Sequence, residues 1–257
     1  MKSSTDTRGE GSGLGLLTKV LGVVLLPVIW HCLKTYVGVS DRYLPSIMSV
    51  IRSFQDIEPN VFVHLGYTVS RFGFGFILGV GAGIGLGLLI FRFLWFRNLI
   101  MPTIQASRAI PAIAIVPFFL LWFGFSELGR YLLVVAGTAF NVAVAALQIL
   151  GSGPEKYGIM FQSFGRKPEE LLFDYGLPLI MERILPTLRF SLSAAIGLIV
   201  ASELLGSQVG LGYLIQTSRS TFSMHVVFLA AILLGVLNAT ADGLLQITWR
   251  KLVWWRQ

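Results

Sequence analysis

The chain alternates between long apolar segments and shorter polar ones. Six stretches are dominated by apolar residues, and each is near the roughly 20 residues that a helix needs to cross a bilayer. They cover about residues 13–37, 67–94, 99–123, 130–150, 187–206 and 226–248. The pattern therefore predicts an all-α polytopic membrane protein with six transmembrane helices. Residues 1–12 are polar and are expected to form a disordered cytoplasmic N-terminus, and residues 13–257 to form a single transmembrane domain.

One polar island, residues 155–189, separates the fourth and fifth predicted spans. It mixes charges of both signs, and its basic residues are Lys156, Arg166, Lys167 and Arg183. Loops rich in lysine and arginine face the cytoplasm, so this loop and both termini are predicted to be cytoplasmic. The first span is predicted to remain uncleaved, because the residues that follow its apolar core, 30–34, are too bulky for a signal-peptidase site.

Glycine recurs at every fourth position of the second predicted span. Gly75, Gly79, Gly83 and Gly87 would form a smooth stripe along one side of a helix. Such a stripe allows the backbone of another helix to approach closely, so these glycines are predicted to be a helix-packing surface. The alternative is a glycine-rich span without a dedicated partner.

The third predicted span carries the first candidates for a solute pathway. It contains Pro102, Pro111 and Pro117, and each proline removes a helical hydrogen bond, so the span is predicted to be kinked or broken. Arg108 lies beside Pro111 in this span. A buried cation there would favour the passage of an anion, although Arg108 could equally pair with a neighbouring helix.

Composition supports the membrane class and bears on the partners. Charged residues make up 13% of the chain, about half the share of roughly 25% in soluble domains. The formal net charge is +7, but the basic residues stand singly at the ends of apolar runs. This distribution favours contact with anionic membrane lipid over a nucleic-acid partner.

The polar island also carries a recognisable motif. Gly165, nine further residues and Tyr175-Gly176-Leu177-Pro178 resemble the cytoplasmic loop signature of ABC importer permeases. The order of further motifs resembles the permeases for sulfonate, taurine, nitrate and related solutes: Leu44-Pro45-Ser46, Ala109-Ile110-Pro111, Leu121-Trp122-Phe123-Gly124, Ala201-Ser202-Glu203 and Gly210-Leu211-Gly212-Tyr213. One departure is that Ile159-Met160-Phe161 stand where the family usually has Glu-Ala-Ala.

The resemblance implies a type I importer permease in the bacterial inner membrane. Two copies would form a homodimer around a central path, two ABC ATPase subunits would dock on the cytoplasmic loops, and an external binding protein would deliver the solute. The solute is then expected to be a small anion such as a sulfonate, taurine or nitrate. A secondary carrier that needs no ATPase and a membrane-embedded enzyme are the rival interpretations.

The predicted coupling loop, about residues 151–186, has the chemistry of a short helix that inserts into a partner. Gly165 permits a sharp turn, and Lys167-Pro168-Glu169-Glu170 is typical of a helix start. Pro178 is expected to end the second of two short helices. The coupling residues are predicted to be Gly165, Arg166, Lys167, Glu169, Glu170, Leu171, Leu177 and Pro178. The alternative is an amphipathic connector on the membrane surface.

The remaining candidates for a pathway or gate lie near the predicted outer end of the fifth span. They are Glu203, Gly210, Gly212 and Tyr213. Pro111 and Arg108 of the third span complete the set of candidates. Glu203 could line a gate or fix helix contacts, or it could be a solvated carboxylate at the end of the span. Asn141, Gln148 and Asn238 are expected to form hydrogen bonds between helices.

Catalysis is not expected in this chain. It has no glycine-rich Walker A phosphate loop, so ATP hydrolysis is predicted to occur on a separate subunit. His31, His64 and His225 are far apart in the sequence, and no catalytic, cofactor-binding or metal-binding constellation is predicted.

Overall fold

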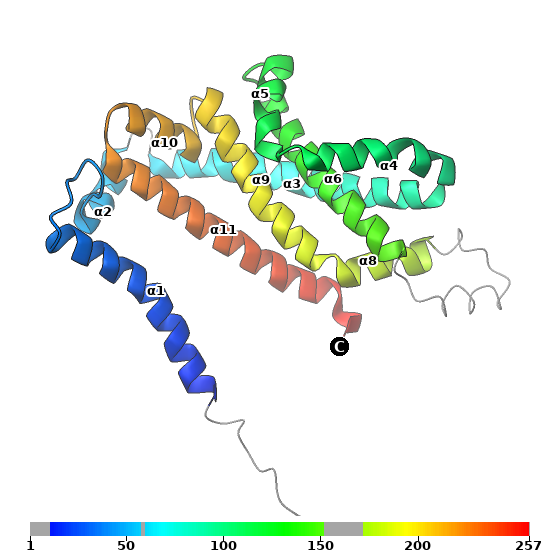
Figure 1. Cartoon of the computed structure of the whole chain (residues 1–257), viewed down its shortest axis with the longest axis horizontal. Coiled ribbons are helices and arrows are strands. Elements are labelled where there is room, and N and C mark those ends of the chain that lie inside the picture. The colour runs from blue at the N-terminus through cyan, green and yellow to red at the C-terminus, as the bar shows by residue number, and fades with distance from the viewer. Residues whose placement is uncertain (1–10, 58–59, 152–171, 257) are drawn as a thin grey trace, which may run out of the picture. The chain divides into compact units, whose positions relative to one another are not determined.

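The computed structural model of the protein describes residues 11–57, 60–151 and 172–256. Every element in these ranges is helical, which confirms the predicted all-α fold (Figure 1). The elements are α1 (Gly11–Thr35), α2 (Ile47–Asp56), α3 (Val61–Arg92), α4 (Leu94–Ala109), α5 (Ala112–Phe123), α6 (Glu127–Gly151), a π-helical turn η1 (Leu172–Gly176), α8 (Leu177–Arg183), α9 (Leu185–Gly206), α10 (Leu211–Ser220), α11 (Met224–Leu252) and a 3-10 turn η2 (Trp254–Arg256).

The chain divides into two compact units. The smaller contains Met1–Ile57 and Ser218–Leu229, and the larger contains Glu58–Thr217 and Ala230–Gln257. Trp30 organises the smaller unit, because its indole Nε1 donates to the Pro45 carbonyl at 2.9 Å and its ring lies 5.2 Å from that of Phe228.

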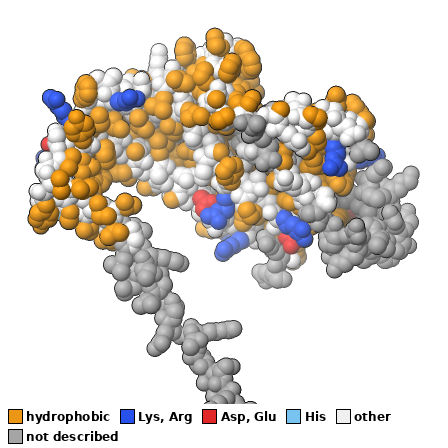
Figure 2. All heavy atoms as spheres, in the orientation of Figure 1, with side chains coloured by type: hydrophobic (Ala, Val, Ile, Leu, Met, Phe, Trp, Pro, Cys, Tyr) orange, Lys and Arg blue, Asp and Glu red, His pale blue; other side chains and the backbone are white. Residues whose placement is uncertain are grey.

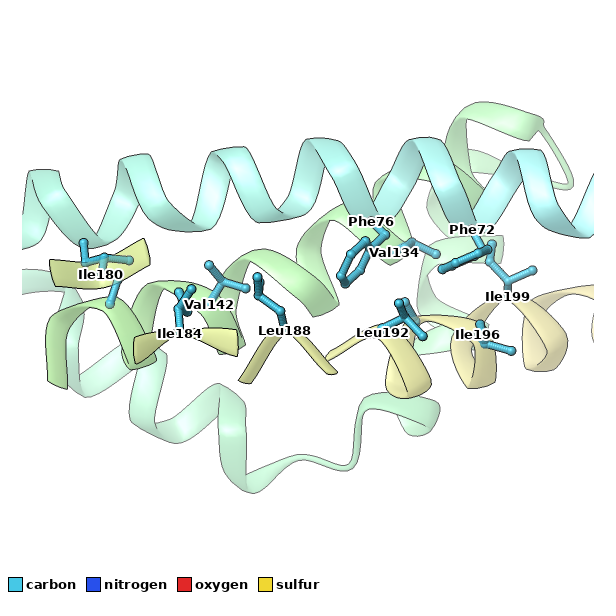
Figure 3. Close-up of a cluster of buried hydrophobic side chains, with 12 residues drawn as sticks. Phe72, Phe76, Val134, Val142, Ile180, Ile184, Leu188, Leu192, Ile196 and Ile199 are labelled. Atoms are coloured by element: carbon cyan, nitrogen blue, oxygen red, sulfur yellow. The ribbon is translucent and has the colours of Figure 1, made fainter. Parts of the chain in front are cut away.

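The larger unit is built on α3, α6 and α9. Their apolar faces meet in one core, shown in Figure 3. In α9 the buried residues recur at helical spacing, and they face the phenylalanines of α3 and the valines of α6. The members labelled there are Phe72, Phe76, Val134, Val142, Ile180, Ile184, Leu188, Leu192, Ile196 and Ile199.

Four helices in the described residues are long and apolar enough to cross a membrane. These helices, α3, α6, α9 and α11, correspond to the second, fourth, fifth and sixth predicted spans. Large apolar side chains on α3 point outward, with Phe74 64% and Ile77 70% exposed, as lipid contact requires. Figure 2 shows hydrophobic side chains over most of the drawn face and charged ones gathered in small clusters. The count of six spans stays a prediction.

The third predicted span is two helices. α4 ends at Ala109 and α5 begins at Ala112, with Pro111 at the N-cap of α5. The chain breaks at this proline because its ring cannot continue the preceding helix and it has no N–H to donate. Pro102 and Pro117, by contrast, lie inside α4 and α5.

Pro178 does not end a helix, and that prediction is wrong. It occupies the second position of α8, which starts at Leu177. Proline is tolerated there because the first N–H groups of a helix have no partner inside the helix. The other predicted coupling residues, Gly165, Arg166, Lys167, Glu169, Glu170 and Leu171, lie outside the described residues.

The glycine stripe of α3 lies directly against α6. A Cβ added at Gly75 would lie 2.6 Å from the Val134 Cβ, and one at Gly83 would lie 2.7 Å from the carbonyl oxygen of Ala139. Gly79 and Gly87 are equally close to Thr138 and Ala146. The intervening Gly73, Gly81 and Gly85 have nothing within 4 Å of that position. The backbones of α3 and α6 therefore pack at a distance that only the fourth-position glycines permit.

This packing predicts that Gly83→Ala destabilises the protein while Gly81→Ala does not. The methyl group at position 83 would overlap a backbone oxygen that cannot rotate away, so the expected loss in free energy of unfolding is about 1–3 kcal/mol. The midpoint of thermal unfolding of the purified protein in detergent would measure it. Equal midpoints for the two variants would contradict the close α3–α6 contact.

Candidate functional site

A buried arginine of α3 bonds to two carboxylates and a loop. Arg71 is 2% exposed and lies on the apolar helix α3, as the eleventh of its 32 residues. Its Nε and Nη2 donate to the two carboxylate oxygens of Glu127 at 2.7 and 2.6 Å. Its Nη1 donates to Glu203 Oε1 at 2.8 Å and to the Val209 carbonyl at 2.6 Å. One guanidinium therefore joins α3 to α6, α9 and the segment before α10.

Glu203 near the end of α9 is the most enclosed member of this network. It is 1% exposed, which contradicts the alternative that it is a solvated carboxylate at the end of the span. Besides Arg71, it accepts a hydrogen bond from the hydroxyl of Thr68 and one from the backbone N–H of Gly212 at 2.9 Å. A buried carboxylate is tolerated only when its oxygens are paired and hydrogen-bonded, as they are here.

A second arginine completes the network. Arg130 on α6 is 4% exposed, and its Nη1 donates to Glu127 Oε1 at 2.7 Å. Its Nη2 donates to the carbonyl of Gly206, the last residue of α9, at 2.6 Å. With Arg71, Glu127 and Glu203, the formal charges cancel. Such cancellation matters because an uncompensated charge inside an apolar bundle costs several kcal/mol.

Two glycines allow the segment between α9 and α10 to close over Glu203. Gly210 has a φ of 137°, and a Cβ on it would overlap the Glu203 carboxyl group. A Cβ on Gly212 would lie 2.6 Å from the carbonyl oxygen of Val200. Gly210 is required for its positive φ. Both positions also require glycine because a side chain would overlap neighbouring atoms.

The same segment is held to α3 by two further contacts. The backbone N–H of Gly210 donates to His64 Nδ1 at 3.1 Å, and the ring of Tyr213 stacks on that imidazole with 6.0 Å between centroids. The N–H of Leu211 donates to the Thr68 hydroxyl at 2.9 Å. The start of α10 is therefore fixed by side chains of α3.

The network borders a hollow of about 600 Å³. Tyr67, whose ring lies 5.2 Å from the Arg71 guanidinium carbon, and Gln208 contribute to its lining. The Glu127 side chain is 45% exposed, so the otherwise buried network reaches solvent on this side.

The structure unites some of the predicted pathway residues and leaves others apart. Glu203, Gly210, Gly212 and Tyr213 meet in one site. Pro111, between α4 and α5, is not part of the network. The side chain of Arg108 lies outside the described part of the chain.

Sequence reasoning missed most of the partners of Glu203. Arg71, Glu127, Arg130 and Thr68 were not singled out, although a charged residue within an apolar span is itself a signal of function. Arg71 is the clearest case, since it stands alone between Tyr67 and the glycine stripe. Among the described residues, no group of three or more His, Cys, Asp or Glu side chains could hold a metal ion.

The network predicts a large penalty for removing one charge. Glu203→Gln keeps the shape of the side chain but leaves Arg71 with incomplete compensation, so the protein should lose about 3 kcal/mol of stability. Thermal unfolding monitored by loss of the monodisperse peak in size-exclusion chromatography would show the loss. Asp41→Asn is the control, because Asp41 pairs with Lys34 at 2.9 Å with its own side chain 77% exposed, where such pairs contribute little.

A double-mutant cycle separates the loss of the Arg71–Glu203 ion pair from general destabilisation of the fold. Arg71→Gln combined with Glu203→Gln should cost less than the sum of the two single substitutions, because the double variant leaves neither charge of that pair uncompensated. Additive losses would show that the pair is not coupled in the protein.

Comparison with known proteins agrees with this architecture. Residues 75–253 match the family described as "Binding-protein-dependent transport system inner membrane component". SsuC of Escherichia coli (strain K12), named as a permease protein for aliphatic sulfonates transport, is 30% identical over 231 residues, 88% of this chain and 87% of its own. TauC of the same organism, a taurine transport system permease protein, is 24% identical over 240 residues, 91% and 87% of the two chains.

A solved structure shows the same fold. A chain of the MetNI methionine ABC transporter, in inward-facing conformations, superposes with a TM-score of 0.61 at 17% identity, covering 77% of this chain and 97% of that one. The likeness confirms the predicted type I importer architecture. With the family match over more than half of its length, the chain belongs to the binding-protein-dependent transport system inner membrane components, the permease subunits of ABC importers.

Proposed function

We propose that this chain is the solute-conducting subunit of an ATP-driven importer for a small organic anion of the sulfonate class. The observation that carries the proposal is the family match over residues 75–253. The names of the relatives support the solute class, since both SsuC and TauC are named for sulfonic acids. A formylaminopyrimidine permease, ThiX, is 29% identical over 91% of this chain, so the solute has to be identified by transport measurements.

The proposed assembly contains two copies of this chain, two ABC ATPase subunits and an external binding protein. Both termini and the loop around residues 151–186 lie on the cytoplasmic side in this proposal, in line with the basic residues of that loop. The ATPases dock on the predicted coupling residues, which are Gly165, Arg166, Lys167, Glu169, Glu170, Leu171, Leu177 and Pro178. The apolar helices and the family description support an inner-membrane location for the assembly.

Movement of the coupling loop can reach the transmembrane helices through α8. Leu179 and Ile180 of α8 are buried, and α8 runs into α9 at Ile184, which is also fully buried. The indole of Trp249 on α11 donates to the carbonyl of Met181 at 2.8 Å. A displacement of α8 is therefore transmitted to both α9 and α11, because closely packed apolar contacts do not absorb it.

The Arg71 network would serve as the opposite, fixed end of α9. It binds the last turn of α9 to α3 and α6 through charge-assisted hydrogen bonds. In the predicted orientation this end faces outward, so Glu203, Gly210, Gly212 and Tyr213 surround the outer gate. ATP-driven closure then switches the helices between two discrete packings, inward-open and outward-open.

The first functional prediction concerns partners. A tagged copy of the chain, purified in mild detergent, is expected to co-elute with untagged copies and with a subunit that carries a Walker A phosphate loop. Mass spectrometry of the eluate identifies these chains, and ATP hydrolysis should require the ATPase subunit. A chain that elutes alone and transports under an ion gradient would instead be a secondary carrier.

The second functional prediction concerns the coupling loop. Gly165→Pro should leave the chain inserted and assembled but lower ATP-dependent uptake at least tenfold, because proline cannot adopt the turn expected there. Uptake of radiolabelled taurine into proteoliposomes containing the complete transporter measures this. Gly165→Ala keeps the backbone N–H and does not lock φ, so this variant should lose less uptake than the proline variant. Full uptake by the proline variant would refute the proposed role of the loop.

A further inference from the structure

A polar groove between α9 and α11 is separate from the Arg71 network. Arg189 and Ser193 of α9 face Asp242 and Asn238 of α11, and together they border a hollow of about 510 Å³. Arg189 Nε and Nη2 donate to the two oxygens of Asp242 at 2.7 and 2.8 Å. Ser193 Oγ lies 3.1 Å from Asn238 Oδ1. Asn238 thus forms the bond between helices that the sequence predicts for it.

The groove lies on the side of α11 that does not pack in the core. Leu234, Leu237 and Ala241 of this helix pack against the core shared by α3, α6 and α9. Gly235 and Ala239 lie on the groove side, where their small side chains leave the hollow open. A row of polar and small residues at helical spacing therefore runs beside an apolar row on the same helix.

This polar face is unsuited to contact with lipid. Asn238 is midway along α11, and the Arg189 side chain remains 49% exposed. Charged and amide groups at such depth are costly in hydrocarbon, so they face water or another protein surface. The groove is therefore suited to face water or another protein surface and not lipid.

The hydrogen bonds leave one edge of Arg189 available. Its bonds to Asp242 use Nε and Nη2, and within the described residues Nη1 donates to no acceptor. Asp242 also accepts from the Gln246 amide at 2.8 Å, which fixes the carboxylate and, through it, the plane of the guanidinium. A guanidinium held in this way presents two parallel N–H groups, a geometry that matches sulfonate, phosphate or carboxylate oxygens.

We propose that the groove is a transient binding site for the oxyanion group of the transported solute, with Arg189 as its direct contact. The inference rests on the proposed function and specifies where the anion binds. Ser193 and Asn238 offer further hydrogen bonds to the same ligand. Asp242 is a positioning residue on the Nε and Nη2 side of Arg189, and its negative charge competes electrostatically with an anion at the free edge. This competition keeps affinity low, and a conduction pathway needs a site from which the solute can leave.

The competition gives a test in which two substitutions act in opposite directions. The probe is 2,2,2-trifluoroethanesulfonate, and its binding to the purified full-length chain in lipid nanodiscs is followed by ¹⁹F NMR line broadening. Wild type is expected to bind with a dissociation constant on the order of millimolar, consistent with a site that must release its ligand. Arg189→Gln should weaken binding at least tenfold. Asp242→Asn should strengthen it at least threefold, because the neutral amide no longer holds the guanidinium as an ion pair.

A purely structural ion pair predicts a different pattern. Either substitution would then break the same contact, and the two would shift binding in the same direction or leave it unchanged. Arg97→Gln is the matched control, because Arg97 is an exposed arginine of α4 outside the groove, and it should bind the probe like wild type. Thermal unfolding of each variant shows that the chain remains folded. Absence of probe binding to wild type, or same-direction shifts, would overturn the site.

The outcome is distinguishable from failure of the proposed function. If the chain co-purifies with its ATPase but the probe does not respond to Arg189 and Asp242, the permease assignment stands and the groove site is wrong. If the opposite shifts are seen but no ATPase is found, the anion site stands and the ATP-driven mechanism is wrong.

Discussion

The larger unit of this protein depends on the compensation of charge inside an apolar bundle. Arg71 could not lie buried on α3 without hydrogen-bond acceptors, and Glu127, Glu203 and the Val209 carbonyl supply them. Because these acceptors belong to α6, α9 and the segment before α10, satisfying one guanidinium fixes the relative position of all of them. The constraint is geometric as well as electrostatic, since a planar fork accepts its partners only in certain directions.

The helices of the larger unit pack in two different ways. Between α3 and α6, glycines let the backbones approach until side-chain methyl groups of one helix lie against the backbone of the other, which makes this pair rigid. Along α9, a continuous row from Ile184 to Ile199 packs by apolar side chains alone. The first contact is suited to a stationary scaffold. The second runs along α9, whose 22 residues span about 33 Å between α8 and the Glu203 end of the helix.

The two charged sites differ in their surroundings, and this difference suggests different roles. In the Arg71 network, Arg71, Arg130 and Glu203 are buried and every carboxylate oxygen has a partner, so any change in it is a large structural event. The Arg189–Asp242 pair has the same charges, but it lies half exposed in a groove. Exposed pairs exchange partners at low cost, as the proposed anion site requires.

The sequence by itself determined the properties that depend on local pattern. Hydrophobic length located α3, α6, α9 and α11 because crossing a bilayer sets the number of apolar residues. Proline chemistry predicted a kink or break in the third span, although only the structure shows that it lies at Pro111, and motif order identified the permease family.

Only the tertiary structure decided which charged groups meet. Arg71 lies 56 residues from Glu127 and 132 from Glu203, and Arg189 lies 53 from Asp242. Nothing in the helical period relates positions so far apart. Their pairing follows from how the helices cross. The position of Pro178 was likewise decided by the structure, because a proline can either follow a helix or occupy its first turn, and here it lies in the first turn of α8.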